Sequence, residues 1–479
     1  MEEKRLSASV LESLPCVDEA RVDELLAREL ERFRSKIVVL DDDPTGVQTV
    51  HDVSVFTGWD SESMDEAFAE PKRLFYILTN SRGLTAEESR ALHREIADAV
   101  DAAAKRAGAR YLIISRSDST LRGHYPLETE VLRDRVEANT GSAIDGEVLC
   151  PFFKEGGRYT LDNIHYVRYG TELVPACETE FARDPTFGYR ALTMPEYVEE
   201  KTAGAYRAQD VTCISLDDLR ALALDRIVEQ LESVGDFNKV VVNAADYVDV
   251  KVFCIALLRA MAHGKRYMFR TAAAFVKVLG GVPDKPLLTR DEMVSDDAAA
   301  SGRGGIVVVG SHTDKTTRQV RQLEQVHGID FVELDATLVR DPARFEAEVE
   351  RCLEAERASI EAGRTVCCYT SRGLVTADTG DPEDELRLSV RISGAVQALV
   401  GRLGARPAFV VAKGGITSSD VGTKALAVRR ATVLGQAAPG IPVWQTGAES
   451  TYPGLPYVIF PGNVGDDGTL RQVVEVLMG

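Results

Sequence analysis

Short apolar runs that alternate with longer amphipathic segments constrain the fold of this chain more than any other feature. In the first half, β-branched runs predict strands at 35–40, 52–56, 73–79, 110–115, 146–150 and 239–244. Helical periodicity between them predicts helices over 85–108 and 216–234. Strands that are apolar along their whole length are usually buried on both faces, as in a parallel sheet covered by helices. The pattern therefore predicts an α/β fold.

The alternation is interrupted once and then resumes. Residues 281–304 are rich in Gly, Pro, Ala and Asp and show little periodicity, so we place a domain linker there. Beyond it, the pattern predicts strands at 305–310, 331–336, 365–370, 408–413, 432–436 and 456–462, and helices over 313–326 and 419–430. A chain of 479 residues is too long for one core. We expect two α/β domains, at 36–285 and 300–479, after a helical extension at 1–35.

Composition narrows the class of partner. The formal net charge of -19 argues against nucleic acid or an anionic membrane as the main partner. The cysteines form no CxxC pair and the histidines form no HExxH motif, so the sequence indicates neither a disulfide framework nor a zinc site. No apolar run is long enough to span a membrane, and the first 33 residues lack the apolar core of a signal peptide. We expect a cytoplasmic protein with a small-molecule ligand.

Charged and hydroxyl side chains follow three predicted strands of the first half, at Asp41–Gly46 ("DDDPTG"), Asn80–Gly83 and Arg116–Arg122. Ligands of open α/β sheets bind beyond the carboxyl ends of the strands. Arginines there can hold a carboxylate, and aspartates can hold sugar hydroxyls, accept a proton or help to bind a metal ion. Each loop alone is equally consistent with a capping turn. Three adjacent aspartates, however, repel one another unless a cation or a ligand offsets their charge.

Three predicted strand ends of the second half also carry polar groups, at Ser311–Thr313, Ser371–Gly373 and Gly414–Asp420. The last has two glycines followed by hydroxyl side chains at a predicted helix start, a pattern that suits a phosphate group. A simple strand-to-helix turn is the alternative. Another glycine-rich turn, "FPGNVGDDGT", follows the last predicted strand. The chain has no P-loop, no GxGxxG fingerprint and no GxSxG motif.

Histidines and one long loop region are further candidates. His51, His124, His165 and His312 lie in predicted loops, where a lone histidine is usually just solvated; His124 and His312 are the favoured ligand contacts. The region 155–200 is polar, aromatic and long, and such an excursion from a compact sheet is more often functional than idle.

Four motifs point to a known family. "DDDPTG", "TNSRGLT", "SRSDSTLRGHYPLE" and "KGGITSSDV" occur in this order, with "ETEFARDP" at 178–185 between the last two. From about residue 36 to 479, the chain resembles the four-carbon acid sugar kinase family. The resemblance implies an N-terminal α/β domain that holds a sugar acid and a C-terminal domain that holds ATP. It also implies phosphorylation of the terminal hydroxyl of an acid such as threonate, erythronate or 3-oxo-tetronate.

The resemblance assigns two sets of binding residues. The substrate-binding set is Asp42, Asp43, Arg82, Arg116, Asp118, Ser119, Thr120 and Arg122. The ATP-binding set is Ser311, Gly414, Gly415, Ile416, Thr417 and Gly462. No metal ligand is assigned, and Mg²⁺ is expected to bridge the ATP phosphates. We expect Asp42 or Asp43 to be the catalytic residue that takes the proton of the attacking hydroxyl, and Asp41, outside the motif proper, to be dispensable.

Two departures from the family pattern predict a divergent member. Arg116 stands where family members usually have a lysine, and an arginine presents a planar fork instead of a point charge. The last glycine turn reads "FPGNVG" where the family typically has "KSGGFG". Two alternatives to a kinase stay open: a lyase or dehydrogenase that acts on a sugar acid, and a non-catalytic sugar-acid-binding protein. A homodimer is one option for the assembly.

Overall fold

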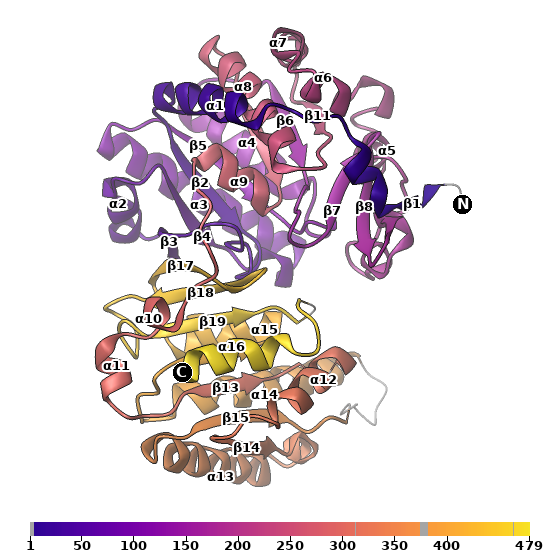
Figure 1. Cartoon of the computed structure of the whole chain (residues 1–479). Helices are drawn as coiled ribbons and strands as arrows, with labels where there is room; N and C mark the ends of the chain where they lie inside the picture. The colour runs from indigo at the N-terminus through magenta and orange to yellow at the C-terminus, as the bar shows by residue number, and fades with distance from the viewer. Residues whose placement is uncertain (1–3, 312, 374–381, 463) are drawn as a thin grey trace. The chain divides into compact units, whose positions relative to one another are not determined.

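The computed structural model describes residues 4–311, 313–373, 382–462 and 464–479, and the chain forms two compact units (Figure 1). Unit 1 comprises Met1–Gly46 and Gly58–Asp284, and unit 2 comprises Val47–Thr57 and Lys285–Gly479. Residues 47–57 thus belong to unit 2, although the sequence placed them in the first domain. The reason is that strand β3 (Val53–Phe56) pairs with β17 (Arg430–Ala438).

A parallel sheet forms the centre of unit 1, as the apolar runs predict. Its strand order is β10-β11-β6-β12-β5-β2-β4. The strands are β2 (Lys36–Asp41), β4 (Leu74–Leu78), β5 (Tyr111–Arg116), β6 (Gly146–Cys150), β10 (Thr212–Ile214), β11 (Asn238–Val242) and β12 (Tyr267–Thr271). Every pairing in it is parallel. Parallel neighbours end at the same edge of a sheet, so the loops after β2, β4, β5 and β12 emerge side by side.

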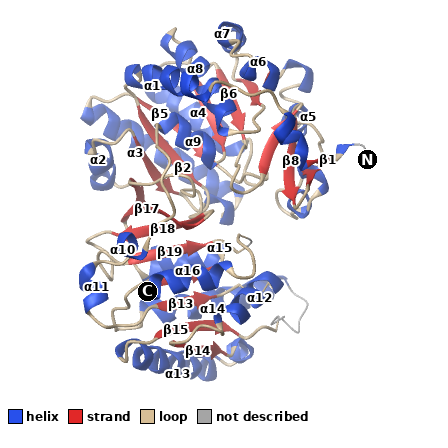
Figure 2. Cartoon of the chain, viewed as in Figure 1, coloured by secondary structure: helices blue, strands red, loops and turns tan. Residues whose placement is uncertain are grey.

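Helices cover this sheet (Figure 2). They are α1 (Glu19–Arg32), α2 (Ser61–Ala69), α3 (Ala86–Ala107), α4 (Leu127–Thr140), α5 (Met194–Lys201), α6 (Leu216–Arg220), α7 (Leu224–Ser233), α8 (Tyr247–Ala262) and α9 (Ala273–Gly280). A capping box at Thr85 begins α3, and Gly108 in the left-handed conformation ends it. The single helix predicted over 216–234 is wrong. The chain breaks into α6 and α7 at Leu222, which has a φ of 53°.

The polar, aromatic region after β6 forms a second, antiparallel sheet that the sequence did not predict. Its order is β1-β9-β8-β7, with β1 (Leu6–Ser7), β7 (Arg158–Leu161), β8 (Ile164–Tyr169) and β9 (Glu172–Pro175). The N-terminal segment supplies β1 and then α1, and Arg259 of α8 pairs with Glu29 of α1 at 2.9 Å. The predicted helical extension is therefore only partly helical, and it packs on unit 1.

The sheet of unit 2 combines antiparallel and parallel strands in the order β3-β17-β18-β19-β16-β13-β15-β14. The remaining strands are β13 (Ile306–Val309), β14 (Ile329–Leu334), β15 (Thr365–Thr370), β16 (Val410–Lys413), β18 (Ile441–Thr446) and β19 (Pro456–Phe460). Pairings from β19 through β14 are parallel, which matches the predicted α/β class. The carboxyl ends of β13 and β16 are adjacent, because these two strands pair directly.

The helices of unit 2 are α10 (Arg290–Met293), α11 (Asp296–Ala300), α12 (Asp314–Leu323), α13 (Pro342–Glu361), α14 (Pro382–Gly401), α15 (Gly415–Asp420) and α16 (Thr469–Met478). The helix predicted over 419–430 is wrong in its bounds. It begins four residues earlier, at Gly415, and continues as a π-helix over Val421–Ala425. The predicted linker contains α10, and its Leu288 and Met293 are buried in the core of unit 2. Across the described ranges, no helix is long and apolar enough to cross a membrane.

Close approach of backbone at Gly304 gives a test of the unit 2 fold. A Cβ on Gly304 would lie 1.8 Å from the carbonyl oxygen of Arg364, which cannot move without disturbing β15. We expect Gly304→Ala to destabilise the protein by about 3 kcal/mol, as overpacking does, measured by urea unfolding. Gly394→Ala is the matched control, because nothing lies within 4 Å of its Cβ position in α14. It should stabilise the protein slightly. Equal urea midpoints for the two variants would contradict the close contact.

Candidate functional site

Arg82, which follows β4, holds together the aspartates that follow β2. Its Nη2 donates to Oδ1 of Asp42 at 2.7 Å, its Nε donates to Oδ2 of Asp42 at 3.1 Å, and its Nη1 donates to Oδ2 of Asp43 at 3.2 Å. Nη1 also lies 3.9 Å from Oδ1 of Asp118, which follows β5. A guanidinium is a rigid planar fork, so one side chain fixes carboxylates from two loops.

Asp41 is buried at the end of β2 and is 1% exposed. Its Oδ1 accepts a hydrogen bond from Nη1 of Arg116 at 2.9 Å. Burial raises the pKa of Asp41 to about 8; Arg116 opposes the shift, while the neighbouring aspartates reinforce it. A Cβ on Gly46 would lie 2.0 Å from Oδ1 of Asp41, so the glycine makes room for the carboxyl group. The Asp41 carboxyl group therefore fills a buried space, and the expectation that it is dispensable for the chemistry stays a prediction.

The two aspartates expected in catalysis have opposite pKa shifts. Burial raises the pKa of Asp42, although its contacts with Arg82 and Arg116 act against the shift. Burial acts in the same direction on Asp43, but the two arginines and hydrogen bonds from Thr45 outweigh it, so the pKa of Asp43 lies below its usual value. Of the two carboxylates, Asp42 takes up a proton more readily.

Asp118 anchors the loop that follows β5, the Asp118 loop (residues 117–122). Its carboxylate accepts hydrogen bonds from the hydroxyl of Thr120 and from Nε and Nη2 of Arg122, the latter two at 2.8 and 3.3 Å. Burial would raise the pKa of Asp118, but Arg82 and Arg122 hold it well below the usual range. Asp118 therefore stays ionised, which suits a group that orients the loop and two guanidinium groups.

Four successive carbonyl oxygens of this loop accept hydrogen bonds from distant side chains. The pairs are Ser119 with His165 Nε2 at 2.7 Å, Thr120 with the Tyr189 hydroxyl at 3.1 Å, Leu121 with the Tyr197 hydroxyl at 2.9 Å, and Arg122 with Arg270 Nη2 at 3.0 Å. Leu121 has a φ of 71°, a conformation that costs energy for a bulky residue. The side chains from the region 155–200 and from β12 hold the loop in this conformation.

Arg270 and Glu128 belong to the same network, although the sequence reasoning did not select them. Nη1 of Arg270 donates to Oγ of Ser117 at 3.0 Å and lies 3.5 Å from Oε2 of Glu128. Gly123, with a φ of 114°, lets the backbone pass close to this group, since a Cβ there would lie 3.3 Å from Arg270 Nη2 and 3.5 Å from Asp42 Oδ2. The sequence feature that could have identified Arg270 is the short apolar run "YMFR", which ends in this arginine.

Of the histidines that the sequence marked as candidates, His165 and His124 have hydrogen-bond partners in unit 1. His124 places Nε2 at 2.9 Å from the carbonyl oxygen of Leu84, and its ring packs edge-on against Phe187. His51 pairs with its neighbour Asp52. His312 lies outside the described residues.

The expected nucleotide-binding residues of unit 2 gather where β13 and β16 end. A Cβ on Gly310 would lie 2.3 Å from the hydroxyl oxygen of Thr417, and one on Gly414 would lie 3.3 Å from the same atom. The hydroxyl of Ser311 accepts a hydrogen bond from Thr316 at 3.1 Å. Gly415 begins α15, and the next side chain, Ile416, is 74% exposed. The absence of side chains at Gly310 and Gly414 thus makes room for the hydroxyl group of Thr417.

Lys413 connects this turn with the last glycine turn. Its Nζ donates to the carbonyl oxygens of Pro461 and Gly462, at 2.6 and 3.2 Å. Burial and the positive charge of Lys315 lower the pKa of Lys413 to about 7. Sequence reasoning selected Gly462 but neither lysine. The signal for Lys413 was its position directly before the glycine pair.

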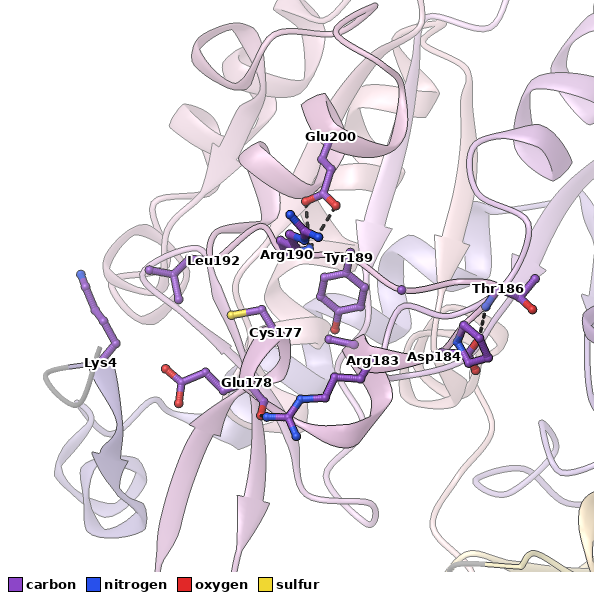
Figure 3. A pocket seen from close by; sticks show the side chains of 13 residues that line it. Lys4, Cys177, Glu178, Arg183, Asp184, Thr186, Tyr189, Arg190, Leu192 and Glu200 are labelled. Carbon is purple, nitrogen blue, oxygen red and sulfur yellow. Dashed lines mark hydrogen bonds between the residues drawn. The ribbon is translucent and has the colours of Figure 1, made fainter.

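A separate cavity of about 640 Å³ lies on unit 1, along the segment from Cys177 to Leu192 (Figure 3). Two of its carboxylates already bind backbone amides: Glu200 accepts from Arg190 N, and Asp184 accepts from Thr186 N. Tyr189 lines this cavity while its hydroxyl reaches the Asp118 loop. No group of three His, Cys, Asp or Glu side chains within the described ranges is placed to hold a metal ion.

The fold and the two groups of residues define an α/β protein with a sugar-binding N-terminal domain and a nucleotide-binding C-terminal domain. Residues 37–279 match a family model described as "Sugar-binding N-terminal domain", and residues 306–470 match one described as "Nucleotide-binding C-terminal domain". The chain belongs to the four-carbon acid sugar kinase family. The resemblance drawn from the sequence motifs is thereby confirmed.

Relatives of the chain are distant. A D-erythronate kinase from Heliobacterium modesticaldum is 24% identical over 328 residues, a match that spans 66% of this chain and 66% of that relative. A Haemophilus influenzae protein of the DUF1537 family has a similar fold, with a TM-score of 0.61, 17% identity and coverage of 92% of this chain and 100% of that one. A protein from Salmonella typhimurium LT2 gives a TM-score of 0.62 at 17% identity, covering 91% of this chain and 98% of its own. These two structures support the fold alone.

Two substitutions of the buried Asp41 separate the contribution of its shape to stability from the contribution of its charge. Since its pKa is raised to about 8, the carboxyl group is largely protonated at pH 7 and an amide should replace it well. We expect Asp41→Asn to change the free energy of unfolding by less than about 1 kcal/mol. Asp41→Ala should cost about 3 kcal/mol, because it leaves a void and removes one of the two carboxyl acceptors of Arg116 Nη1. Urea unfolding of both variants at pH 7 checks this, and an equal loss in both would contradict it.

Because His165 is buried, we expect the protein to lose stability as the pH falls. Burial lowers its pKa to about 4, below the usual 6.5, while Nε2 bonds the Ser119 carbonyl and Nδ1 lies 2.9 Å from the Thr160 hydroxyl. As pH falls from 6.5 to 4, the unfolded chain takes up a proton that the folded chain does not, so stability falls by about 3 kcal/mol. Between pH 6.5 and pH 4, the unfolding free energy of wild type should therefore fall by about 3 kcal/mol more than that of His165→Gln. Parallel pH profiles would contradict the assignment.

Proposed function

We propose that this protein is an ATP-dependent kinase that phosphorylates a terminal hydroxyl of a small sugar acid. The observation that carries the proposal is the set of paired aspartates and arginines at the sheet edge of unit 1, which lies within the residues matched by the sugar-binding family model. The nucleotide-binding match of unit 2 and the distant D-erythronate kinase support the same activity. A four-carbon acid such as erythronate, threonate or 3-oxo-tetronate is the proposed substrate class.

Asp42 is the proposed base for the acceptor hydroxyl. A general base should have a pKa raised toward the working pH, and burial raises the pKa of Asp42 while that of Asp43 is lowered. Arg82 holds Asp42 through both oxygens, so the carboxylate keeps one orientation. Asp43 also accepts a hydrogen bond from the Thr45 amide at 2.7 Å, which suits a residue that shapes the loop and holds sugar hydroxyls.

The glycine turn after β16 is the proposed phosphate-binding element. Gly414 and Gly415 stand at the start of α15, where backbone amides can bind a phosphate, and Thr417 and Ser311 lie beside Gly414 with their hydroxyl groups. Lys413 directly precedes that turn in the chain and, with its lowered pKa, regains charge when an anion binds. Mg²⁺ that arrives on ATP supplies charge neutralisation and needs at most one or two protein carboxylates.

A coupled assay of ADP release against C4 to C6 aldonic and keto acids, with Mg²⁺ and ATP, tests the activity. Turnover of at least one acid, together with ATP-dependent thermal stabilisation, is the expected result. Tight acid binding without ADP formation would identify a non-catalytic sugar-acid-binding protein. Acid conversion without any effect of nucleotide would favour the lyase or dehydrogenase alternative.

Substitution of the two aspartates separates their roles. Asp42→Asn should lower kcat by about 10²- to 10⁴-fold, the usual contribution of a general base, with the KM for ATP unchanged. Asp43→Asn should mainly raise the KM for the sugar acid. Steady-state kinetics at saturating ATP measure both effects. Full turnover in Asp42→Asn would exclude Asp42 as the base, and circular dichroism of each variant controls for folding.

A further inference from the structure

Arg158, the first residue of β7, packs on the aromatic ring of Phe181. Arg122 of the Asp118 loop packs on the same ring. Its Cζ is 5.3 Å from the ring centroid of Phe181, and the Cζ of Arg122 is 5.1 Å from that centroid. Such distances are typical of cation–π contacts, which hold guanidinium groups in place. Burial lowers the pKa of Arg158, and the proximity of Asp118 and Arg122 also acts on it. Arg158 therefore belongs to the charged region that begins with the aspartate triplet.

The partners of Arg158 differ from those of the other arginines in this region. Each of the others lies within 4 Å of a protein carboxylate: Arg82 with Asp42, Arg116 with Asp41, Arg122 with Asp118, and Arg270 with Glu128. In the described part of the chain, Arg158 pairs with no carboxylate. Its side chain donates only to the carbonyl oxygen of Gly156, and its Nε is buried without an acceptor.

A partly buried guanidinium whose Nε has no acceptor and that pairs with no carboxylate is costly, because arginine stays charged at every physiological pH. The charge of Asp118 offsets this cost only in part, because its carboxylate already binds Thr120 and Arg122. A ligand that brings its own carboxylate would relieve it. Arginine suits that ligand, because its planar fork matches a carboxylate with two hydrogen bonds.

We propose that Arg158 binds the carboxylate of the sugar acid, an inference that rests on the proposed function. The acid end of the substrate then lies at Arg158, and its hydroxyls extend along the Asp118 loop toward Asp42. Contacts of named groups connect the two ends, since Arg82 touches both Asp42 and Asp118. Each arginine that the sequence offered for this carboxylate pairs with a protein aspartate and sets its position: Arg82 with Asp42, Arg116 with Asp41 and Arg122 with Asp118.

This assignment makes Arg158 the residue that selects an acid over a neutral sugar. A polyol or a primary amide of the same chain length would keep the hydroxyl contacts but leave the guanidinium without a counter-charge. Wild type should therefore bind the acid more tightly than its amide, and the preference should depend on Arg158.

The test compares Arg158→Gln with Arg168→Gln and uses the acid that wild type turns over. Arg168 is the matched control because it lies on the neighbouring strand β8, is exposed, and donates through Nε to the carbonyl oxygen of Gly170. We expect Arg158→Gln to raise the KM and the calorimetric Kd for the acid by at least about 30-fold, the usual cost of losing a buried charge pair. The KM for ATP and the Kd for the amide should stay unchanged.

Arg158→Lys keeps the charge and guards against a folding defect in the glutamine variant. It should bind the acid with an affinity between that of wild type and Arg158→Gln, because an ammonium cannot make the paired contact. Unchanged acid affinity in Arg158→Gln, or an equal loss for acid and amide, would overturn the proposal. A wild-type protein that binds no sugar acid would instead overturn the proposed function, so the two failures are distinct.

Discussion

The candidate site depends on the contacts that the guanidinium group of Arg82 makes with three aspartates. Asp42 and Asp43 follow one strand and Asp118 follows another, and all three carboxylates lie within 4 Å of this one side chain. Without it, three like charges would share a space with little water, and repulsion would favour a different loop arrangement. The pairing also explains the opposite pKa shifts, because each aspartate has a different balance between burial and contact with arginine.

The antiparallel sheet β1-β9-β8-β7 and the segment after it give the site its second layer of support. His165, Tyr189 and Tyr197 each bind one carbonyl oxygen of the loop from Ser119 to Leu121. A loop with all its carbonyl oxygens turned toward such donors has few alternative conformations, so Asp118 and Arg122 keep their positions. The region 155–200, which the sequence marked as a long excursion from the sheet, therefore restricts the conformation of the Asp118 loop, and supporting hydrogen bonds of this kind keep a site's geometry precise.

Sequence patterns predicted the parallel sheets and the family, because both rest on features that repeat along the chain or occur as exact motifs. They failed where a decision depended on distant contacts. Strands β7, β8 and β9 are short and partly polar, and only their mutual pairing and the packing of Tyr159 and Tyr166 make them strands. Strand β12 is apolar but short, and it was not predicted, so Arg270 was not selected either. The break at Leu222 and the early start of α15 at Gly415 follow from local backbone geometry that periodicity does not report.

The sequence by itself determined the α/β class, the loops that carry Asp42, Arg82, Asp118 and Gly414, and membership in a family of sugar-acid kinases. The tertiary structure decided how those charges pair. Arg82 and Arg116 hold aspartates of their own chain, Asp41 fills a buried space, and Arg158 pairs with no carboxylate of the described residues. The physical reason is that ion pairing depends on the distances between side chains, and folding alone brings distant side chains together. The sequence shows which charged residues the chain contains but not which of them form pairs.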